Sequence, residues 1–293
     1  MKELPTPTFP FSQLGAWEWC QALWPAPLHR TKTITVPAVA PAPANEVPQP
    51  AGGGISVSWA RHQDEVRAAQ RLRYEVFAGE MGARLDTPLE GHDVDLFDDF
   101  CEHLLVRDEP TGQVIGTYRV LTPAQARRVG STYSDTEFDL TRLRDLRERM
   151  VELGRSCVHA EHRQGGVILA LWGALAAFMN RNRLDTMIGC ASIPMRHKGV
   201  SSGDAAASIW RQLSATHMAP IQYHVQPRLP LPVNRLDDRL DVEPPALIKG
   251  YLRLGAKVLG PPAWDPDFNS ADLPMLMRIE DLPARYRKHF LGD

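Results

Sequence analysis

Long apolar runs are missing from this sequence. No stretch of 18 or more consecutive apolar residues occurs, so no segment is predicted to cross a membrane as a helix. The first residues also lack the basic start and long apolar core of a secretory signal peptide. We therefore expect a cytoplasmic protein, and peripheral contact with the inner face of the membrane stays open as an addition to this expectation.

An excess of charge of one sign is missing as well. The 33 Lys and Arg residues nearly balance the 35 Asp and Glu residues, so the formal net charge at pH 7 is -2. This balance carries no signature of a nucleic-acid-binding protein, and no nucleic-acid partner is expected. The four cysteines are widely separated and form no C-x-x-C pair, which favours free thiols in a reducing compartment.

Residues 1–54 differ in composition from the rest of the chain. Val36–Ala44 and Pro48–Gly54 are rich in Pro, Ala and Gly, which is typical of an extended linker. An aromatic segment with few charges precedes them and contains Phe9, Phe11, Trp17, Trp19 and Trp24. Two interpretations of this segment stay open: shallow insertion into a lipid interface, or docking on the surface of the protein's own domain.

From Ile55 onward the pattern is that of a folded domain, which we assign to residues 55–293. Strands are predicted at 55–59, 103–107, 113–121, 150–159 and 186–192, with two more near Lys257 and Leu276. Helices are predicted at 63–79, from the loop after His159 to Phe178, at 203–217, at 245–254 and at the C-terminus. This order favours an α/β fold with one mixed sheet over two separate domains.

The most informative local feature is a strand, a basic glycine-containing loop and a helix between Met150 and Phe178. The loop reads Arg163-Gln-Gly165-Gly166-Val167 and has neither Rossmann nor Walker A spacing. A helix that begins in such a loop presents unpaired N–H groups and its positive dipole end, so phosphate is the natural ligand. A plain turn is the alternative.

The strand that leads into this loop carries two charged residues, Glu152 and Arg155. Strand alternation places Glu152 on one face with Gly154, and Leu153 on the other with Arg155. A charged group in a buried sheet is costly unless it is paired or functional. An internal ion pair between Glu152 and Arg119 of the preceding hairpin is the structural alternative to a catalytic role.

Four motifs together resemble the set shared by acyl-homoserine-lactone synthases and N-acyl amino acid synthases. They are Arg73-x-x-x-Phe77, Asp95-x-x-Asp98, Arg119 in Gly-Thr-Tyr-Arg-Val-Leu, and Glu152-x-x-Arg155. Longer stretches resemble a closer branch, the L-ornithine Nα-acyltransferases of ornithine-lipid synthesis: 100–106, 152–158, 171–172, 188–192, 245–255 and 267–272. The homoserine-lactone branch has a tryptophan shortly after the first motif, whereas residues 78–83 here contain none.

The resemblance implies a GNAT-like acyl-CoA N-acyltransferase fold, a single domain behind the N-terminal extension. It also implies transfer of a 3-hydroxyacyl group from acyl carrier protein to the α-amine of L-ornithine, which gives lyso-ornithine lipid. No bound cofactor is expected, because the acyl carrier protein brings its own phosphopantetheine thioester. Two rivals stay open: an enzyme that uses acyl-CoA or another amine, and a catalytically silent module that binds a carrier or lipid.

Roles for individual residues follow from the resemblance and the chemistry. Glu152 is the predicted general base, and Arg155 is predicted as a second catalytic residue. The oxyanion is expected to be held by a backbone N–H near 155–157. Asp95 and Asp98 bind the acceptor's side-chain ammonium or form ion pairs in an acidic loop. Arg73 and Arg119 bind the acceptor carboxylate or hold those aspartates. Phe77 belongs to the same substrate-binding set.

The phosphopantetheine is expected at Arg163, Gly165, Gly166 and Val167. A positive rim of Arg163, Arg196, His197 and Lys198 is the predicted docking surface for the acidic carrier protein, and a solvated surface is the alternative. Cys157 as a covalent nucleophile is disfavoured, because no Cys-His-Asp arrangement is evident. A metal site at His159, Glu161 and His162 is also disfavoured, because a third convincing ligand is missing, and no metal is expected.

Overall fold

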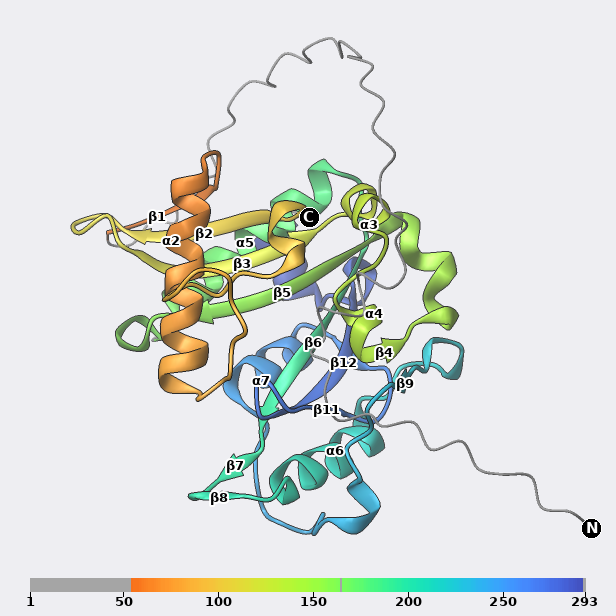
Figure 1. Ribbon diagram of the computed structural model, residues 1–293. Helices are drawn as coiled ribbons and strands as arrows, with labels where there is room; N and C mark the ends of the chain where they lie inside the picture. The colour runs from red at the N-terminus through yellow and green to blue at the C-terminus, as the bar shows by residue number, and fades with distance from the viewer. Residues whose placement is uncertain (1–53, 164, 292–293) are drawn as a thin grey trace, which may run out of the picture. The chain divides into compact units, whose positions relative to one another are not determined.

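The structure is a computed structural model that describes residues 54–163 and 165–291 (Figure 1). These residues belong to one compact unit, which spans Glu46–Asp293. The predicted linker, the aromatic segment before it and Cys20 lie outside the described residues. The first described strand, β1 (Ile55–Trp59), begins where the sequence predicted it.

The main sheet is mixed, as the sequence predicted. Its strands run in the order β1-β2-β3-β5-β6-β12-β10, and β11 pairs with β12 outside this path. Only β5 and β6 pair in parallel, while the other neighbouring strands pair antiparallel. The remaining strands of this sheet are β2 (Glu102–Asp108), β3 (Val114–Leu121), β5 (Met150–Val158), β6 (Thr186–Pro194), β10 (Lys257–Val258), β11 (Ala263–Asp265) and β12 (Ser270–Arg278). Two short ribbons pair β4 (Phe138–Asp139) with β9 (Gln226–Pro227), and β7 (Arg196–His197) with β8 (Val200–Ser201).

The long helices occupy the predicted places. They are α2 (Gln63–Tyr74), α5 (Gly166–Arg181), α6 (Asp204–Thr216), α7 (Ala246–Arg253) and α8 (Ala284–Leu291). The predicted helix at 63–79 changes to a π-helix, η1 (Glu75–Glu80), in its last part. Gly255, with φ 95°, lies just beyond α7, in the left-handed conformation that suits a residue after a helix.

Residues 122–149, for which the sequence pattern predicted no elements, form several short ones. They are α3 (Pro123–Val129), α4 (Ser134–Glu137), β4 and the 3-10 helix η3 (Thr141–Arg149). The hydroxyl of Thr122 accepts a hydrogen bond from the backbone N–H of Gln125, and Pro123 follows at the first helical position, so α3 has a strong start signal. Among the described residues, five further 3-10 turns lie at Leu96–Asp99, Ala160–His162, Ile221–Tyr223, Val233–Arg235 and Ile279–Asp281.

Helices cover the sheet on both faces (Figure 1). One face buries Tyr118, Val120 and Val151 against α5 in one hydrophobic cluster. On the other face α2 packs against Leu105 and Cys157, and the 138–143 segment packs against Met150 and Ile188. The two faces therefore have different covers, and residues that alternate along β3 and β5 enter different surroundings.

The sheet opens between its two parallel strands. The pairing of β5 with β6 runs only from Met150–Thr186 to Glu152–Ile188, and Figure 1 shows β6 turning away beyond this point. Gly189 allows the last close approach, because a Cβ there would collide with the carbonyl oxygen of Leu153. The backbone edges beyond Glu152 consequently face a gap in the sheet.

A β-bulge lies on β5 beside this opening. Thr117 of β3 pairs with Cys157 and Arg119 pairs with Gly154, so Tyr118 alone faces both Arg155 and Ser156. Arg155 has φ 49°, a conformation that is uncommon for a non-glycine residue. The bulge reverses the strand alternation from Arg155 onward, so the simple alternation predicted for 152–155 is wrong at Arg155.

Candidate active site

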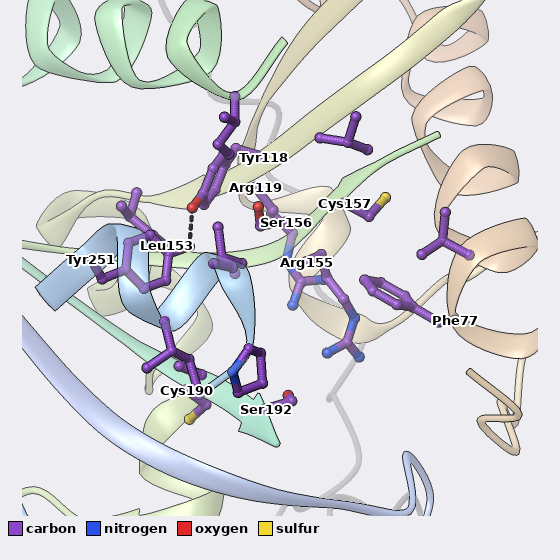
Figure 2. Close-up of a pocket in the computed structure, with 18 of the residues that line it drawn as sticks. Phe77, Tyr118, Arg119, Leu153, Arg155, Ser156, Cys157, Cys190, Ser192 and Tyr251 are labelled. Atoms are coloured by element: carbon purple, nitrogen blue, oxygen red, sulfur yellow. Dashed lines mark hydrogen bonds between the residues drawn. The ribbon is translucent and has the colours of Figure 1, made fainter. Parts of the chain in front are cut away.

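A cavity of about 530 Å³ lies where β5 and β6 separate (Figure 2). Glu152, Leu153, Gly154 and Arg155 of β5 line one side of it, and residues 190–192 of β6 line the other. Helix α5 contributes Ile168 and Trp172, and α7 contributes Ile248 and Tyr251. The cavity therefore reaches both faces of the sheet through the gap between the strands.

The two faces of the cavity differ in polarity. Glu152 aligns with Ile188 on β6, and Ser192 aligns with Asp272 on β12, so strand alternation places Glu152, Cys190, Ser192 and Asp272 on one face. Arg119 pairs with Gly154 and lies on this face as well. The charged groups thus gather on the face covered by α2, which we call the polar arm.

The opposite face, covered by α5 and α7, forms an apolar arm. Its lining includes Leu153, Ile168, Leu247 and Ile248. Gly250 of α7 packs directly on the ring of Trp172, where a Cβ would collide. An arm of this composition suits a hydrocarbon chain.

Four hydrogen-bonding groups interrupt the apolar arm. The hydroxyls of Tyr118 and Tyr251 are hydrogen-bonded to each other, as Figure 2 shows. Burial raises the pKa of Tyr118, and hydrogen bonding to Ser156 opposes that rise. The indole Nε1 of Trp172 is buried beside the hydroxyl of Tyr118, and this N–H also opposes the rise in the pKa of Tyr118. An acyl chain that carried a hydroxyl would find donors and acceptors here.

Three arginines and three aspartates form a charge network beside the polar arm. Arg73 is fully buried and binds both oxygens of Asp98, at 2.9 and 2.8 Å. It also donates from Nε to Asp93 at 2.8 Å. Burial alone would raise the pKa of Asp98, but Arg73 and Arg119 hold it well below its usual range. Arg73 therefore holds the acidic loop in place, which is one of the two roles the sequence left open.

Arg119 and Arg155 complete the network. Arg119 donates to Asp95 at 2.5 Å and to Asp98 at 3.3 Å. Arg155 donates to Asp93 and to Asp95, each at 3.1 Å. Arg119 thus pairs with these aspartates, and the structure shows no ion pair between it and Glu152 in the part of the chain described.

Aromatic rings surround the guanidinium of Arg155. It lies 4.9 Å from the ring centroid of Tyr133 and 4.7 Å from that of Phe268. Phe77, which the sequence placed in the substrate-binding set, lines the cavity and packs edge-on against Phe268 at 5.6 Å. Arg155 is therefore held from several sides, and its guanidinium joins the aspartate loop to the cavity wall.

Glu152 lies in the cavity wall with 5% of its surface exposed. Its two oxygens accept hydrogen bonds from the backbone N–H groups of Tyr133, at 2.7 Å, and Ser134, at 2.6 Å. Burial raises the pKa of Glu152, and hydrogen bonds from Ser134 and Tyr133 oppose the rise. A carboxylate held in this way keeps lone pairs for a further proton, as a general base requires.

A second acidic group, for which the sequence suggested no role, lies at the far end of the polar arm. Asp272 and Asp265 line the cavity and are 3% and 6% exposed. Burial and Asp265 raise the pKa of Asp272 to about 6. Burial, Asp272 and Asp265 raise the pKa of Glu137 to about 8. The available signal was the carboxylate of Asp272 just before the apolar run Leu273–Met277 of strand β12, whose first seven residues are all buried.

The basic loop before α5 reaches the mouth of the cavity. Gly165 has φ 102° and lies at the N-cap of α5. Gly165 and Arg163 line the cavity, whereas the side chain of Val167 is buried against Gly116. Gly166 is exposed and is not part of the cavity lining, so of the predicted phosphate residues Arg163 and Gly165 face the cavity. Arg163 also binds Glu80 at 2.6 Å.

The remaining predicted residues lie around this mouth or on the surface. Cys157 is buried, and burial raises the pKa of its thiol to about 12, which disfavours the thiolate that a nucleophile needs. His159, Glu161 and His162 bring one potential ligand atom each within 4.8 Å of one another. Arg196 and Lys198 are exposed on the β7–β8 hairpin.

Among the described residues, no helix combines the length and apolar character needed to cross a membrane.

Comparison with known proteins gives matches over most of the chain. Residues 72–173 match the family model for an acetyltransferase (GNAT) domain. An L-ornithine N(alpha)-acyltransferase of Agrobacterium fabrum is 34% identical over 265 residues, which cover 82% of this chain and 86% of the relative. A protein of the same name from Brucella abortus is 33% identical and covers 81% and 89%. A third, from Rhodobacter capsulatus, is 34% identical and covers 79% and 92%.

The fold is also similar to those of solved structures, among them the following synthases. The CoA-dependent acyl-homoserine lactone synthase BjaI, with MTA, is 15% identical with a TM-score of 0.49, and the match covers 82% of this chain and 89% of that one. FeeM, an N-acyl amino acid synthase from uncultured soil microbes, is 11% identical with a TM-score of 0.47, and the match covers 79% and 96%.

Proposed function

Because this chain belongs to the L-ornithine Nα-acyltransferase family, we propose that it transfers a 3-hydroxyacyl group from acyl carrier protein to the α-amine of L-ornithine. The product of this reaction is lyso-ornithine lipid. The fold is that of a GNAT N-acyltransferase, and the GNAT match includes β5, the loop after it and the start of α5. The rest of the proposal is drawn from the cavity.

One observation carries the proposal: the cavity passes through the sheet beside Glu152. The apolar arm lies on one face, and the polar arm with its buried carboxylates lies on the other. An acyl chain and a charged amino acid need opposite surroundings, and here they would meet at the carboxylate of Glu152. This arrangement favours a direct transfer between two bound substrates over a catalytically silent binding module.

The donor is proposed to enter past Arg163 and Gly165. The first N–H groups of α5 have no partner within the helix and attract an anion, which suits the phosphate of phosphopantetheine. The thioester would then lie along β5 and the acyl chain in the apolar arm. The hydroxyls of Tyr118 and Tyr251, together with Ser156 and the indole N–H of Trp172, supply partners for a 3-hydroxyl.

The proposed reaction is a nucleophilic attack of the neutral α-amine on the thioester carbonyl. A carbon–nitrogen bond forms, the carbon–sulfur bond breaks, and the sulfur leaves as the pantetheine thiol. Glu152 accepts the proton of the amine, directly or through one water, and that proton is returned to the departing thiolate. Backbone N–H groups on the free edge of β5, near 155–157, would hold the oxyanion.

Attack by the α-amine agrees with its acidity. The ordinary pKa of an α-amino group is about 8, against about 10.4 for a side-chain amine, so it loses its proton more readily near neutral pH. The raised pKa of Glu152 brings this base closer to the same range. The raised pKa makes Glu152 a stronger proton acceptor than an ordinary exposed glutamate.

The test is to incubate the purified protein with 3-hydroxyacyl carrier protein or with acyl-CoA, and with ornithine or a panel of other amino acids. Mass spectrometry should find Nα-acylornithine, formed preferentially from the carrier-bound donor. Preference for acyl-CoA or for another amine would support the first rival, and failure to form any product would support the silent module. Charge reversal of Arg196 and Lys198 tests the docking rim, because an unchanged donor KM at low salt would argue against it.

A further inference from the structure

The buried carboxylates of this protein fall into two groups that differ in their partners. Three guanidinium groups, of Arg73, Arg119 and Arg155, face three carboxylates, of Asp93, Asp95 and Asp98. In contrast, Glu137, Asp265 and Asp272 form no ion pair within 4 Å in the described part of the chain. We call these three residues the acidic pocket.

Two members of the acidic pocket line the cavity, and the third, Glu137, lies close enough to them for their charges to raise its pKa. Asp272 and Asp265 are both more than nine-tenths buried and line the cavity wall. Asp272 lies on the same face of the sheet as Glu152, as the registers of β5, β6 and β12 require. Between them lies Cys190, whose thiol is 3.5 Å from the hydroxyl of Ser134. Asp272 therefore lies at the far end of the polar arm that begins at Glu152.

The local hydrogen bonds do not neutralise these carboxylates. Asp272 accepts a hydrogen bond from the hydroxyl of Ser270 at 2.9 Å. One oxygen of Asp265 accepts from the backbone N–H groups of Asp267 and Phe268, at 2.9 and 3.0 Å. These partners orient the carboxylates but bring no positive charge. Burial and mutual repulsion raise the pKa of Asp272 and Glu137, so a bound cation would relieve an unfavourable arrangement.

The arginine–aspartate network is less suited to a cationic ligand. Both oxygens of Asp98 bind Arg73, and both oxygens of Asp95 bind arginines. A ligand ammonium near this network would also meet three guanidinium groups of its own sign. Of the two groups, the acidic pocket offers carboxylates that have no ion-pair partner within 4 Å among the described residues, although the charge of Arg155 acts on Asp272 and Glu137 from further away.

We propose that Glu137, Asp265 and Asp272 bind the side-chain ammonium of the amino-acid acceptor. This inference rests on the proposed function and names the residues that select a diamino acid. It also explains why only one amine reacts. The ammonium in the acidic pocket stays protonated and cannot attack, whereas the α-amine, at the other end of the acceptor, faces Glu152 and the thioester.

The experiment compares two acceptors of equal length, ornithine and norvaline, which has the same carbon chain without the terminal amine. The quantity measured is the ratio of kcat/KM for ornithine to that for norvaline. In the Asp272→Asn variant this ratio should fall about 10- to 100-fold, the usual worth of a hydrogen bond to a charged group. Glu137→Gln should shift the ratio in the same direction, and it carries less folding risk because Glu137 is only partly buried.

The control is Asp86→Asn, which removes an exposed carboxylate outside the cavity lining and should leave the ratio unchanged. A second readout is regiochemistry: tandem mass spectrometry of the product should show a larger share of Nδ-acylornithine in Asp272→Asn. The inference would be overturned if Asp272→Asn and Glu137→Gln each lowered kcat/KM equally for ornithine and norvaline and left the site of acylation unchanged. The proposed function would still stand in that case. Failure of the wild type to acylate ornithine would instead overturn the proposed function.

Discussion

The backbone N–H of Ser134 donates a 2.6 Å hydrogen bond to Oε1 of Glu152. Ser134 begins α4, and Glu152 lies in the third position of β5. The neighbouring N–H of Tyr133 binds the other oxygen, so a short helix start fixes the carboxylate at the point where β5 and β6 separate. The position of the proposed base is thus set by a segment outside the sheet.

The charge network should be essential for stability. Arg73→Ala would leave Asp93 and Asp98 buried without their main partner, and loss of one member of a buried pair costs about 3–5 kcal/mol. Denaturant unfolding should show a loss of this size. Arg71→Ala, at an exposed position two residues earlier on the same helix, should stay within about 0.5 kcal/mol of the wild type. Similar midpoints for the two variants would show that the network contributes little.

The acidic pocket should make the protein less stable at high pH. A carboxyl whose folded pKa is raised keeps its proton in the folded state while the unfolded chain loses it, so stability falls as pH rises through that window. For Asp272 the window runs from its ordinary pKa of 3.8 to about 6, and for Glu137 from 4.5 to about 8.

Asp272→Asn removes one of these charges and should raise the melting temperature more at pH 8 than at pH 4. Melting curves of both proteins across this range check the sign. Ornithine should stabilise the wild type at pH 8 more than norvaline does. A larger gain for the variant at pH 4 than at pH 8 would contradict the raised pKa of Asp272.

The close approach at Gly189 should be required for the opening of the sheet. Gly189→Ala would place a methyl group against the carbonyl of Leu153, and overpacking of this kind costs about 1–3 kcal/mol. Gly173→Ala is the matched control: it lies within α5, where a Cβ meets only open space and the ring of Phe290 at 4.0 Å. That change should stabilise the protein slightly, by about 0.5–1 kcal/mol. This account would be contradicted if the melting temperatures of both variants were higher, or both lower, than that of the wild type.

The hydroxyl pair in the apolar arm should discriminate between donors. Tyr251→Phe removes one partner of the Tyr118 hydroxyl and should lower the preference for 3-hydroxyacyl over unsubstituted acyl donors by about 2- to 10-fold, the usual worth of a neutral hydrogen bond. Competition between the two donors, followed by mass spectrometry of the products, measures this preference. An unchanged preference in both Tyr251→Phe and Tyr118→Phe would place the 3-hydroxyl elsewhere.

Much of the framework could be predicted from the sequence because it rests on local patterns. The alternation at Ile55–Trp59, the hairpin around Gly112 and the helix that ends before Gly255 depend on periodicity and turn residues. The strand, loop and helix from Met150 to Phe178 follow from the same rules. These elements place Glu152, Arg163 and Gly165 along one cavity.

The residues that the sequence missed depend on contacts between distant segments. Tyr133 and Ser134 contribute backbone N–H groups, which nearly every residue type carries, so no pattern marks them. Arg155 lies at a bulge, where one extra residue reverses the alternation that a regular strand would keep. Asp272 is a carboxylate in a mostly apolar strand, which the sequence analysis passed over, and the register of β12 with β6 brings it to the cavity.

The most direct test of the central claim is the steady-state kinetics of Glu152→Gln with ornithine and a carrier-bound donor. Glutamine keeps the size of the side chain, but its single amide oxygen can accept only one of the two backbone hydrogen bonds from Tyr133 and Ser134. Circular dichroism and denaturant unfolding therefore accompany the kinetics, and a folded variant should keep its donor KM. Its kcat should fall about 10²- to 10⁴-fold. Wild-type kcat at saturating ornithine should decline at acid pH as Glu152, whose pKa is raised, takes up a proton, and this contribution should be missing from the variant. A kcat within a few-fold of the wild type, with the acid decline unchanged, would contradict the role of Glu152 as the base.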